Sequence, residues 1–468
     1  MSTEMAAASI GDRLDRLAWS RRHTTILIAL GAGWMFDSFE VQVFSSAVGP
    51  LGDEFRASVF ARDAVLAVWL VGILLGALVG GRLTDRFGRR RLFLVTLLWY
   101  AGFTMLTGLA PSLGWVYALR FLAALGVGAE YAIVNAAIAE FMPARVRGRA
   151  NAVVMNFWPA GAILAALMAY LLLNSAALSA GLSWRLTFVV GGLLALVVLF
   201  FRRRIPESPR WLAVRGRHAE ADAIVCALEA ASGQPASPGH ASAEVAPLAT
   251  GAALRELVRR HPGRLALGAS LDLAEAFGYY GLFALLSVVV LPQVQFSQAE
   301  IPFFYILGNL GALAGGLLMS SFFDRLGHRR TVLGCYTAAA AGVGFLAAAT
   351  ATGSAAWVTV AFVVANACAT AAWTSAYPTF TELFPTHLRG AGVGASVAIG
   401  RVGAIVGTLL LPALATTAGA TTSYLLVVGF WLAGAGAMAV YARRGGPEAA
   451  GRSLEALSPR SDLATTAA

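Results

Sequence analysis

The chain has 468 residues; 58% of them are hydrophobic, only 13% are charged, and the mean hydropathy is +0.70. These values exclude an ordinary soluble globular domain, in which about 25% of the residues are charged. A net charge of +10 would suggest a nucleic-acid partner in a soluble chain, but here the arginines lie in short loops between apolar segments, so we expect the lipid bilayer and no nucleic acid as the partner.

Apolar stretches of about 20 residues recur about a dozen times, and each is long enough to cross a hydrocarbon layer of about 30 Å as a helix. Because lipid offers the backbone no hydrogen-bond partners, we expect helices and not the short alternating strands of a barrel. We predict membrane-spanning helices at residues 24–50, 63–83, 92–110, 114–141, 150–173, 185–203, 265–292, 300–323, 331–350, 355–384, 390–415 and 421–442.

Arginine clusters mark alternate loops of this predicted helical chain. They lie at Arg13 to Arg22, Arg86 to Arg91, Arg145 to Arg149, Arg202 to Arg217, Arg325 to Arg330, Arg389, and Arg443 to Arg444. The loops between them carry almost no net positive charge. The positive-inside tendency therefore predicts a multi-pass protein of the cell (inner) membrane with the basic loops and both termini in the cytoplasm. The first 22 residues are polar and show no cleavable signal peptide.

Three pairs of motifs recur in the same order along the chain, which indicates internal duplication. The pairs are DRFGRRR at Asp85–Arg91 with DRLGHRR at Asp324–Arg330, EFMPARVRG at Glu140–Gly148 with ELFPTHLRG at Glu382–Gly390, and DSFE at Asp37–Glu40 with DLAE at Asp272–Glu275. Their offsets are 239, 242 and 235 residues. The predicted fold class is therefore an all-α membrane protein with twelve transmembrane helices in two pseudo-symmetric six-helix bundles.

The repeat also divides the chain into segments. We predict the two bundles at residues 24–203 and 265–442, joined by a cytoplasmic linker at 204–264. Within that linker, HAEADAIVCALEAA and AALRELVRR have the pattern of short amphipathic helices at the membrane surface. Residues 1–23 form a cytoplasmic N-terminal segment, and residues 443–468 form a cytoplasmic tail that we expect to be disordered.

Seven ionisable side chains lie at membrane depth within the predicted helices, where each costs about 2.5–3.5 kcal/mol at the helix centre on insertion scales. They are Asp37, Glu40, Arg120, Glu130, Asp272, Glu275 and Arg401. Asp37 and Glu40 lie three residues apart and share one helix face. Two carboxylates so close in a low-dielectric cavity cannot both ionise easily, so one of them is suited to take up and release a proton.

The loop motif GRLTDRFGRRR resembles the signature between helices 2 and 3 of the major facilitator superfamily. PESPRWL at Pro206–Leu212 and the E-x-x-P-x-x-x-R-G pattern resemble the sugar-porter branch. FGYYGLF at Phe277–Phe283 and GRVGAIVG at Gly400–Gly407 are similar to the subgroup of bacterial niacin transporters and synaptic-vesicle glycoproteins. The resemblance covers about residues 24 to 442. It implies a monomeric transporter of a small molecule, with no catalytic residue, metal or cofactor.

In that superfamily helices 1, 4, 7 and 10 line the central cavity. Six of the seven buried charges fall on these helices. RFLAALGVG at Arg120–Gly128 resembles the helix 4 arginine motif of sugar porters, in which the arginine pairs with an aspartate of helix 1. The resemblance therefore implies that Asp37 accepts the proton and Arg120 is its switchable partner, with Glu130 and Glu40 as substitutes. Alternatively, Arg120 extends its long side chain toward the membrane surface.

The second half offers a candidate substrate site. Arg401 is either the ion-pair partner of Glu275 or an anchor for a substrate carboxylate, since a forked guanidinium suits planar carboxylates. Aromatic walls for a ring-bearing solute are available from Trp34, Phe36, Trp158, Tyr279, Tyr280, Trp373 and Tyr377, although each of these side chains alone also fits core packing or a lipid-facing position. The glutamine-rich helix 7 pattern of sugar porters is absent, and DLAEAFGYY, which begins at Asp272, takes its place. We therefore expect the substrate to be a small organic acid and not a hexose.

The loop motifs predict ionic latches that close the cytoplasmic face when the cavity opens outward. The residues of this predicted gate are Asp85, Arg89, Glu140, Arg147, Asp324, Arg325, Glu382 and Arg389. The alternative is that these charges only fix topology and bind anionic headgroups. The sequence as a whole predicts a proton-coupled symporter of a carboxylate-bearing or aromatic metabolite, with a proton-driven exporter and a non-transporting nutrient sensor as alternatives.

Overall fold

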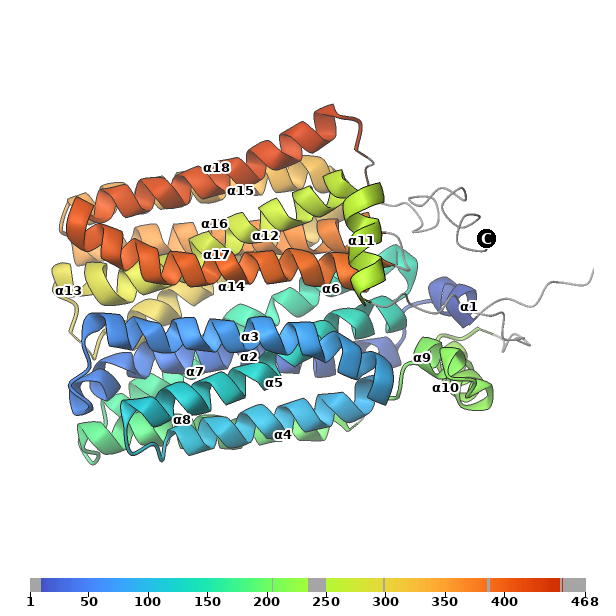
Figure 1. Ribbon diagram of the computed structural model, residues 1–468, viewed down its shortest axis with the longest axis horizontal. Helices are drawn as coiled ribbons and strands as arrows, with labels where there is room; N and C mark the ends of the chain where they lie inside the picture. Colours follow the sequence, from blue (N-terminus) through green and yellow to red (C-terminus); the bar gives the residue numbers. More distant parts are fainter. Residues whose placement is uncertain are drawn as a thin grey trace, which may run out of the picture.

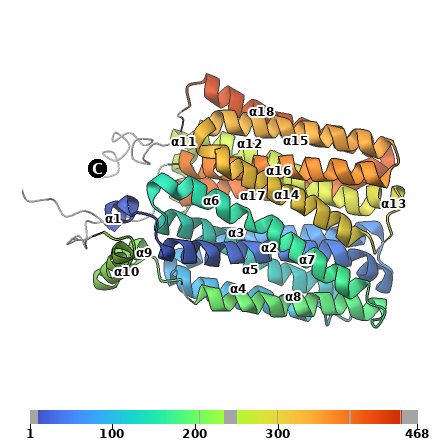
Figure 2. The same ribbon diagram turned by 180° about the vertical axis from the view of Figure 1, so that it is seen from behind.

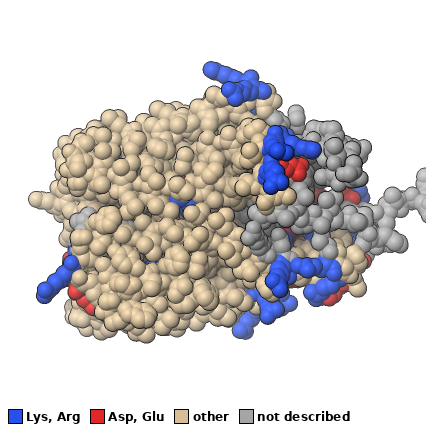
Figure 3. Space-filling view, in the orientation of Figure 1, with Lys and Arg blue, Asp and Glu red and all other residues tan. Residues whose placement is uncertain are grey.

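The computed structural model describes residues 10–203, 205–234, 250–297, 299–384, 388–446 and 448, apart from the side chains of some residues within the helices. Long helices run side by side along one axis (Figures 1 and 2), and the described residues contain no strand. The helices at Ile10–Arg16, Pro209–Val214, His218–Ala231 and Thr250–Arg260 lie at one end of the bundle (Figure 1), which we call the basic end because arginines gather there (Figure 3).

Six long segments form each half of the molecule. In the first half they are α2 (Arg21–Glu54), α3 (Val59–Phe87), α4 (Arg89–Thr107), α5 (Leu113–Phe141), the broken segment α6 (Arg147–Met155) and α7 (Phe157–Leu173), and α8 (Ala180–Arg202). In the second half they are α12 (Pro262–Leu285) with a π turn (Leu286–Val290) and α13 (Leu291–Gln293), α14 (Ile301–Leu326), α15 (His328–Ala351), α16 (Ala355–Leu383), α17 (Arg389–Ala418) and α18 (Ala420–Arg443). These bounds lie within a few residues of those predicted from the sequence.

The two halves repeat the same packing. In the first half α3 packs on α5, α4 on α5 and α8, and α2 on α7 and α8; in the second half α14 packs on α16, α15 on α16 and α18, and α12 on α17 and α18. The halves meet where α7 contacts α14 and where α3 contacts α17. The structure thus confirms the predicted class, an all-α membrane protein of two pseudo-symmetric six-helix bundles.

Among the described residues, eleven helices are long and apolar enough to cross a membrane. The remaining long helix, α4, has 19 residues and begins with three arginines, which lower its hydropathy. It nevertheless lies between α5 and α8, as its counterpart α15 lies between α16 and α18. A helix of 19 residues is about 28 Å long, so α4 is the twelfth spanning helix.

Small residues let paired helices approach closely. Gly76 of α3 lies against the carbonyl of Leu125 in α5, and a Cβ at this glycine would overlap that carbonyl. Gly315 of α14 lies in the same way against the carbonyl of Ala367 in α16. These glycines therefore act as packing positions, as small residues four apart do in membrane helices.

The fifth segment is not the continuous helix that the sequence predicted over residues 150–173. It breaks at Asn156, between α6 and α7. Pro159 has no N–H to donate to the carbonyl of Met155, four residues earlier, so the helix loses a hydrogen bond there. The Asn156 side chain instead donates to the carbonyl of Ala152 at 2.8 Å and to the Ser320 hydroxyl of α14 at 2.9 Å.

Two tight turns connect helices at the basic end. Gly88 has a φ of 86°, which favours glycine, and it lets α4 begin directly after α3. The backbone N–H of Arg89 then donates to the Glu207 carboxylate at 2.8 Å. Gly327 has a φ of 76° between α14 and α15, where the N–H of His328 donates to Glu448 at 2.9 Å. Each carboxylate follows the last helix of its half and stabilises the positive N-terminus of the third.

A small helical unit lies beside the first half at the basic end (Figure 2). It consists of α1 (Ile10–Arg16), α9 (Pro209–Val214) and α10 (His218–Ala231). The sequence predicted α10 with these bounds, whereas α9 and α1 were not expected. An apolar cluster joins the three helices, and its members are Ile10, Leu14, Leu17, Leu212, Ala213, Ala221, Val225 and Leu228.

Arg13 is the polar centre of this unit and is buried. Its guanidinium donates to both Glu229 oxygens at 2.9 and 2.8 Å, to Asp222 at 2.6 Å and to the Cys226 sulfur at 3.4 Å. The hydrogen bonds with Glu229 raise the pKa of Arg13. The N-terminal segment is therefore fixed to the helices that follow the first bundle.

We expect Arg13→Gln to release α1 from α10, because it leaves the buried Glu229 without its cation. Breaking a buried ion pair costs about 3–5 kcal/mol. Hydrogen exchange across residues 209–231 should accelerate in the variant. Arg16→Gln is the matched control, since Arg16 is an exposed side chain on the same helix. Equal exchange rates in the two variants would show that the buried pair does not hold the unit together.

Candidate functional site

Aromatic side chains from both halves meet in the middle of the bundle. Trp34 of α2 lies 4.5 Å from Tyr131 of α5, 6.0 Å from Trp158 of α7 and 6.3 Å from Trp373 of α16, measured between ring centroids. Trp373 in turn lies 5.9 Å from Tyr279 of α12. The structure thus brings together aromatic residues that the sequence singled out, with Tyr131 as an additional member that was not expected.

One polar group of this aromatic cluster forms a hydrogen bond between the halves, and others are left to bind a ligand. The Trp158 indole donates to the Tyr279 hydroxyl at 3.0 Å, which links α7 to α12. The indole nitrogens of Trp34 and Trp373 are buried and have no hydrogen-bond partner among the described residues. Buried donors normally have a partner, so these two indoles are suited to hydrogen-bond a polar ligand.

Arg401 of α17 lies beside the aromatic cluster and is buried. It donates from Nη1 to the Tyr280 hydroxyl at 2.9 Å, and its guanidinium carbon lies 4.9 Å from the ring centre of Tyr131 and 5.3 Å from that of Tyr280. Within the part of the chain that the structure describes, its Nε has no hydrogen-bond partner. The pairing with Glu275 that the sequence left open is not formed, although both side chains are described.

Two aspartates at equivalent positions of the halves are buried. They are Asp37 of α2 and Asp272 of α12, and neither Asp37 oxygen accepts a hydrogen bond from any described residue. Asp272 lies directly against Gly400, where a Cβ would overlap its Oδ2. Because Gly400 is the residue before Arg401 on α17, this contact places the Asp272 carboxylate close to the backbone of Arg401.

The family resemblance implied that Arg120 pairs with Asp37, but in the structure Arg120 pairs with another acid of α2. Its Nη1 donates to Glu40, and the Thr104 hydroxyl donates to the other Glu40 oxygen. The reason is axial position: α2 runs away from the basic end, so Glu40 lies about 4.5 Å farther along it than Asp37. Arg120 is near the far end of the antiparallel α5, at the level of Glu40. Arg120 is also buried and does not extend to the membrane surface.

Glu130 of α5 pairs with Arg202, a residue that the sequence placed in a cytoplasmic arginine cluster. Arg202 is the last residue of α8 and is 1% exposed. Its Nη2 donates to Glu130, and its Nη1 donates to the carbonyl of Phe93 at 2.8 Å. Gly33 of α2 leaves the space for this pair, because a Cβ there would overlap both charged groups. The only sign of this role of Arg202 in the sequence was Glu130, a carboxylate at membrane depth that requires a cationic partner.

The predicted gate is described only in part. Arg89 binds Glu140 through two hydrogen bonds of 3.1 and 2.7 Å, and both residues belong to the first half. The other six gate side chains lie outside the described ones; they are those of Asp85, Arg147, Asp324, Arg325, Glu382 and Arg389. The latch between the halves therefore stays a prediction.

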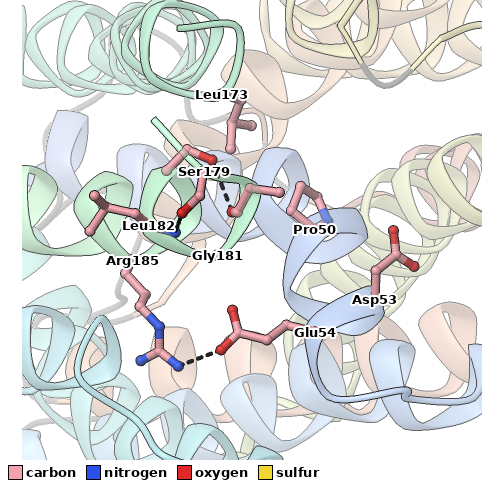
Figure 4. Close-up of a pocket in the computed structure, with 10 residues that line it drawn as sticks. Pro50, Asp53, Glu54, Leu173, Ser179, Gly181, Leu182 and Arg185 are labelled. Atoms are coloured by element: carbon pink, nitrogen blue, oxygen red, sulfur yellow. Dashed lines mark hydrogen bonds and ion pairs between the residues drawn. The ribbon is translucent and has the colours of Figure 1, made fainter. Parts of the chain in front are cut away.

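A cavity of about 750 Å³ lies in the first half (Figure 4), among helix ends that Figure 1 places opposite the basic end. It is lined by the end of α2 and the start of α8. Arg185 pairs with Glu54 there at 2.6 Å, and the Trp184 indole donates to the same carboxylate at 2.6 Å. All its lining residues belong to the first half. This cavity is therefore separate from the aromatic cluster at the junction of the halves.

Two matching six-helix bundles around a buried polar centre define a secondary transporter with the major facilitator fold. Residues 31–460 match the family described as Sugar (and other) transporter, and the chain belongs to that family. It is similar to the niacin transporter NiaP of Acinetobacter baylyi, with 29% identity over 407 residues, 85% of this chain and 89% of that protein. It is also similar to the probable 4-methylmuconolactone transporter of Cupriavidus pinatubonensis, with 27% identity and 85% of each chain covered.

Among solved structures, the fold matches that of the proton:xylose symporter XylE bound to 6-bromo-6-deoxy-D-glucose. The TM-score is 0.75 with 19% identity, covering 93% of this chain and 98% of that one. At this identity the likeness concerns the fold. It agrees with the element order and packing of the two halves.

We expect Glu130→Gln to lower the thermal unfolding temperature of the purified protein in detergent. The substitution leaves Arg202 as an uncompensated buried cation, which costs about 3–5 kcal/mol. Adding Arg202→Met should recover much of that loss, because an apolar side chain then replaces the unpaired charge. Losses that simply add in the double variant would contradict the pairing.

Proposed function

We propose that the protein imports a small aromatic carboxylate together with a proton, by alternating access of a site between the two bundles. The observation that carries the proposal is Arg401, a buried cation with no carboxylate within ion-pair distance among the described residues, set among aromatic rings of both halves. Substrate sites at the junction of two repeats are the usual arrangement in secondary transporters.

The environment of Arg401 favours a carboxylate ligand. Burying an unpaired charge costs several kcal/mol, and a bound anion would remove that penalty. Tyr280 and Tyr131 hold the guanidinium by a hydrogen bond and by ring contacts, which leaves Nε without a partner. A charge-assisted pair with Arg is the common means of recognising a planar carboxylate.

The aromatic cluster favours a planar ring in the same ligand. Trp34, Trp158, Trp373 and Tyr279 offer ring faces within stacking range of one another. Offset and edge-on ring contacts each contribute about 0.5–1.5 kcal/mol. Niacin, after which a similar protein is named, is a pyridine carboxylate and has both of these chemical features.

Asp37 is the proposed proton acceptor. Its carboxylate is buried beside two ion pairs, Glu40 with Arg120 and Glu130 with Arg202, but takes part in neither. A buried acid without a partner is the group whose ionisation costs most, so it favours the protonated form until a cation or water reaches it. We therefore assign Glu40, Glu130 and Arg120 to the supporting network of Asp37, and Asp272 with Glu275 to the substrate side.

The arginine-rich end is the proposed cytoplasmic face, in a monomer of the inner membrane with both termini inside. The gate residues named above would close this face when the central site opens outward. A proton-driven exporter has the same fold and the same groups, and a nutrient sensor would bind without transport. Purified protein in liposomes, tested with aromatic, aliphatic and sugar solutes under an imposed pH gradient, separates these possibilities: import accumulates solute, export depletes it, and a sensor only binds.

We expect Arg401→Gln to raise the KM for an aromatic carboxylate roughly 10- to 100-fold, because a hydrogen bond to a charged group contributes about 1.5–3 kcal/mol. Arg401→Lys should recover only part of this, since it keeps the charge but loses the fork. Arg62→Gln is the control, because Arg62 forms an exposed ion pair with Asp53. Uptake kinetics that stay the same in Arg401→Gln would remove Arg401 from the substrate site.

We expect Asp37→Asn to abolish accumulation driven by a pH gradient, because an amide cannot take up and release the proton. Exchange of labelled for unlabelled substrate across the same liposomes should persist, since the carboxylate site is intact. Binding of substrate should also lose its pH dependence. Gradient-driven uptake at the rate of the unchanged protein would exclude Asp37 as the coupling group.

A further inference from the structure

Helix α11 (Thr250–Arg260) is the one labelled helix of the second half that runs across the basic end instead of along the bundle axis (Figure 1). It contacts the starts of α12 and α17. Ala253 and Leu257, one turn apart, are buried against the bundle. The orientation is that of a helix lying in the plane of a membrane whose normal follows the long helices.

The rest of α11 is divided into lines of distinct chemistry. Leu254 and Val258 form an exposed apolar line, with 42% and 55% of their surface accessible. At about 100° per residue, this line lies a quarter turn around the helix from Ala253 and Leu257. Arg255 and Arg259 form the next line, a further quarter turn around, and both are exposed.

These two arginines form no ion pair with any described residue, whereas Arg260 lies 3.8 Å from Glu256 on the same helix. Stabilisation of the negative helix C-terminus accounts for arginines in the last turn. It does not account for Arg255, which lies a turn earlier. Figure 3 shows the basic side chains over α11 next to the uncharged surface of the long helices.

We propose that α11 is an interfacial anchor that binds the headgroups of anionic phospholipids. Ala253 and Leu257 pack on the bundle. In this orientation the apolar line of Leu254 and Val258 faces the boundary with the acyl chains. The arginine line points away from the bundle at the level of the headgroups. Interfacial helices bind in this way, with apolar side chains in the acyl boundary and cations on anionic lipid. An acidic soluble partner would be attracted by the arginines but would not require Leu254 and Val258. The proposal is independent of the substrate.

The test compares hydrogen exchange of the backbone amides of residues 253–260 in nanodiscs of phosphatidylcholine alone and with added phosphatidylglycerol. We expect slower exchange with phosphatidylglycerol, and a loss of that protection, roughly tenfold, in Arg255→Gln/Arg259→Gln. Leu254→Asn/Val258→Asn should lose protection in both lipids. Arg215→Gln/Arg217→Gln is the control with the same charge change, placed on the linker before α10, and it should behave as the unchanged protein.

A second measurement guards against variants that merely unfold α11. Native mass spectrometry of the detergent-purified protein should show phosphatidylglycerol retained more than phosphatidylcholine, with less retained in the arginine variant than in the control. Equal exchange in the two lipids, or equal lipid retention in the arginine and control variants, would overturn the proposal. Protection that depends on the arginines but not on Leu254 and Val258 would also overturn it, and would point to a soluble acidic partner.

Discussion

The cost of placing charge inside an apolar bundle governs the architecture of the first half. Glu40 with Arg120 joins α2 to α5, and Glu130 with Arg202 joins α5 to α8. Each pair neutralises a charge that could not stay ionised alone at this depth. Close approach at Gly33 is needed to leave room for the second pair. Three helices of the half are thus held in register by electrostatics as well as by packing.

The second half treats its charges differently, although its helices repeat the same packing. Asp272, Glu275 and Arg401 are all buried, yet no ion pair joins any two of them. The Arg401 guanidinium is held by Tyr280 and Tyr131, and not by carboxylates. The pseudo-symmetric fold therefore contains one half in which Arg120 and Arg202 are each paired with a buried carboxylate, and one half whose cation remains open to an incoming anion. This asymmetry is the physical basis for placing the ligand on the side of the second bundle.

The sequence predicted the helices, the duplication and the linker helix α10 because hydropathy and repeated motifs are local signals. Among the described residues, it also identified every charge buried deep in the spanning helices except Arg202. That residue begins a run of three arginines at the end of an apolar segment, where depth cannot be read from the order of residues. The choice of Glu40 over Asp37 as partner of Arg120 depends on axial level between antiparallel helices. The break at Asn156 depends on Pro159 together with a hydroxyl from the other half.

The carboxylate caps at the basic end also bear on how the chain tolerates additions. Glu207 lies within the linker, but Glu448 lies near the C-terminus and binds the start of α15 through the backbone of His328 and Arg329. The end of the second bundle is thus held against the start of its third helix, α15, by a residue only a few positions beyond α18. An affinity tag or fluorescent protein fused after Ala468 leaves this tie intact, whereas one joined directly at Gly446 would remove it and loosen the tight turn at Gly327.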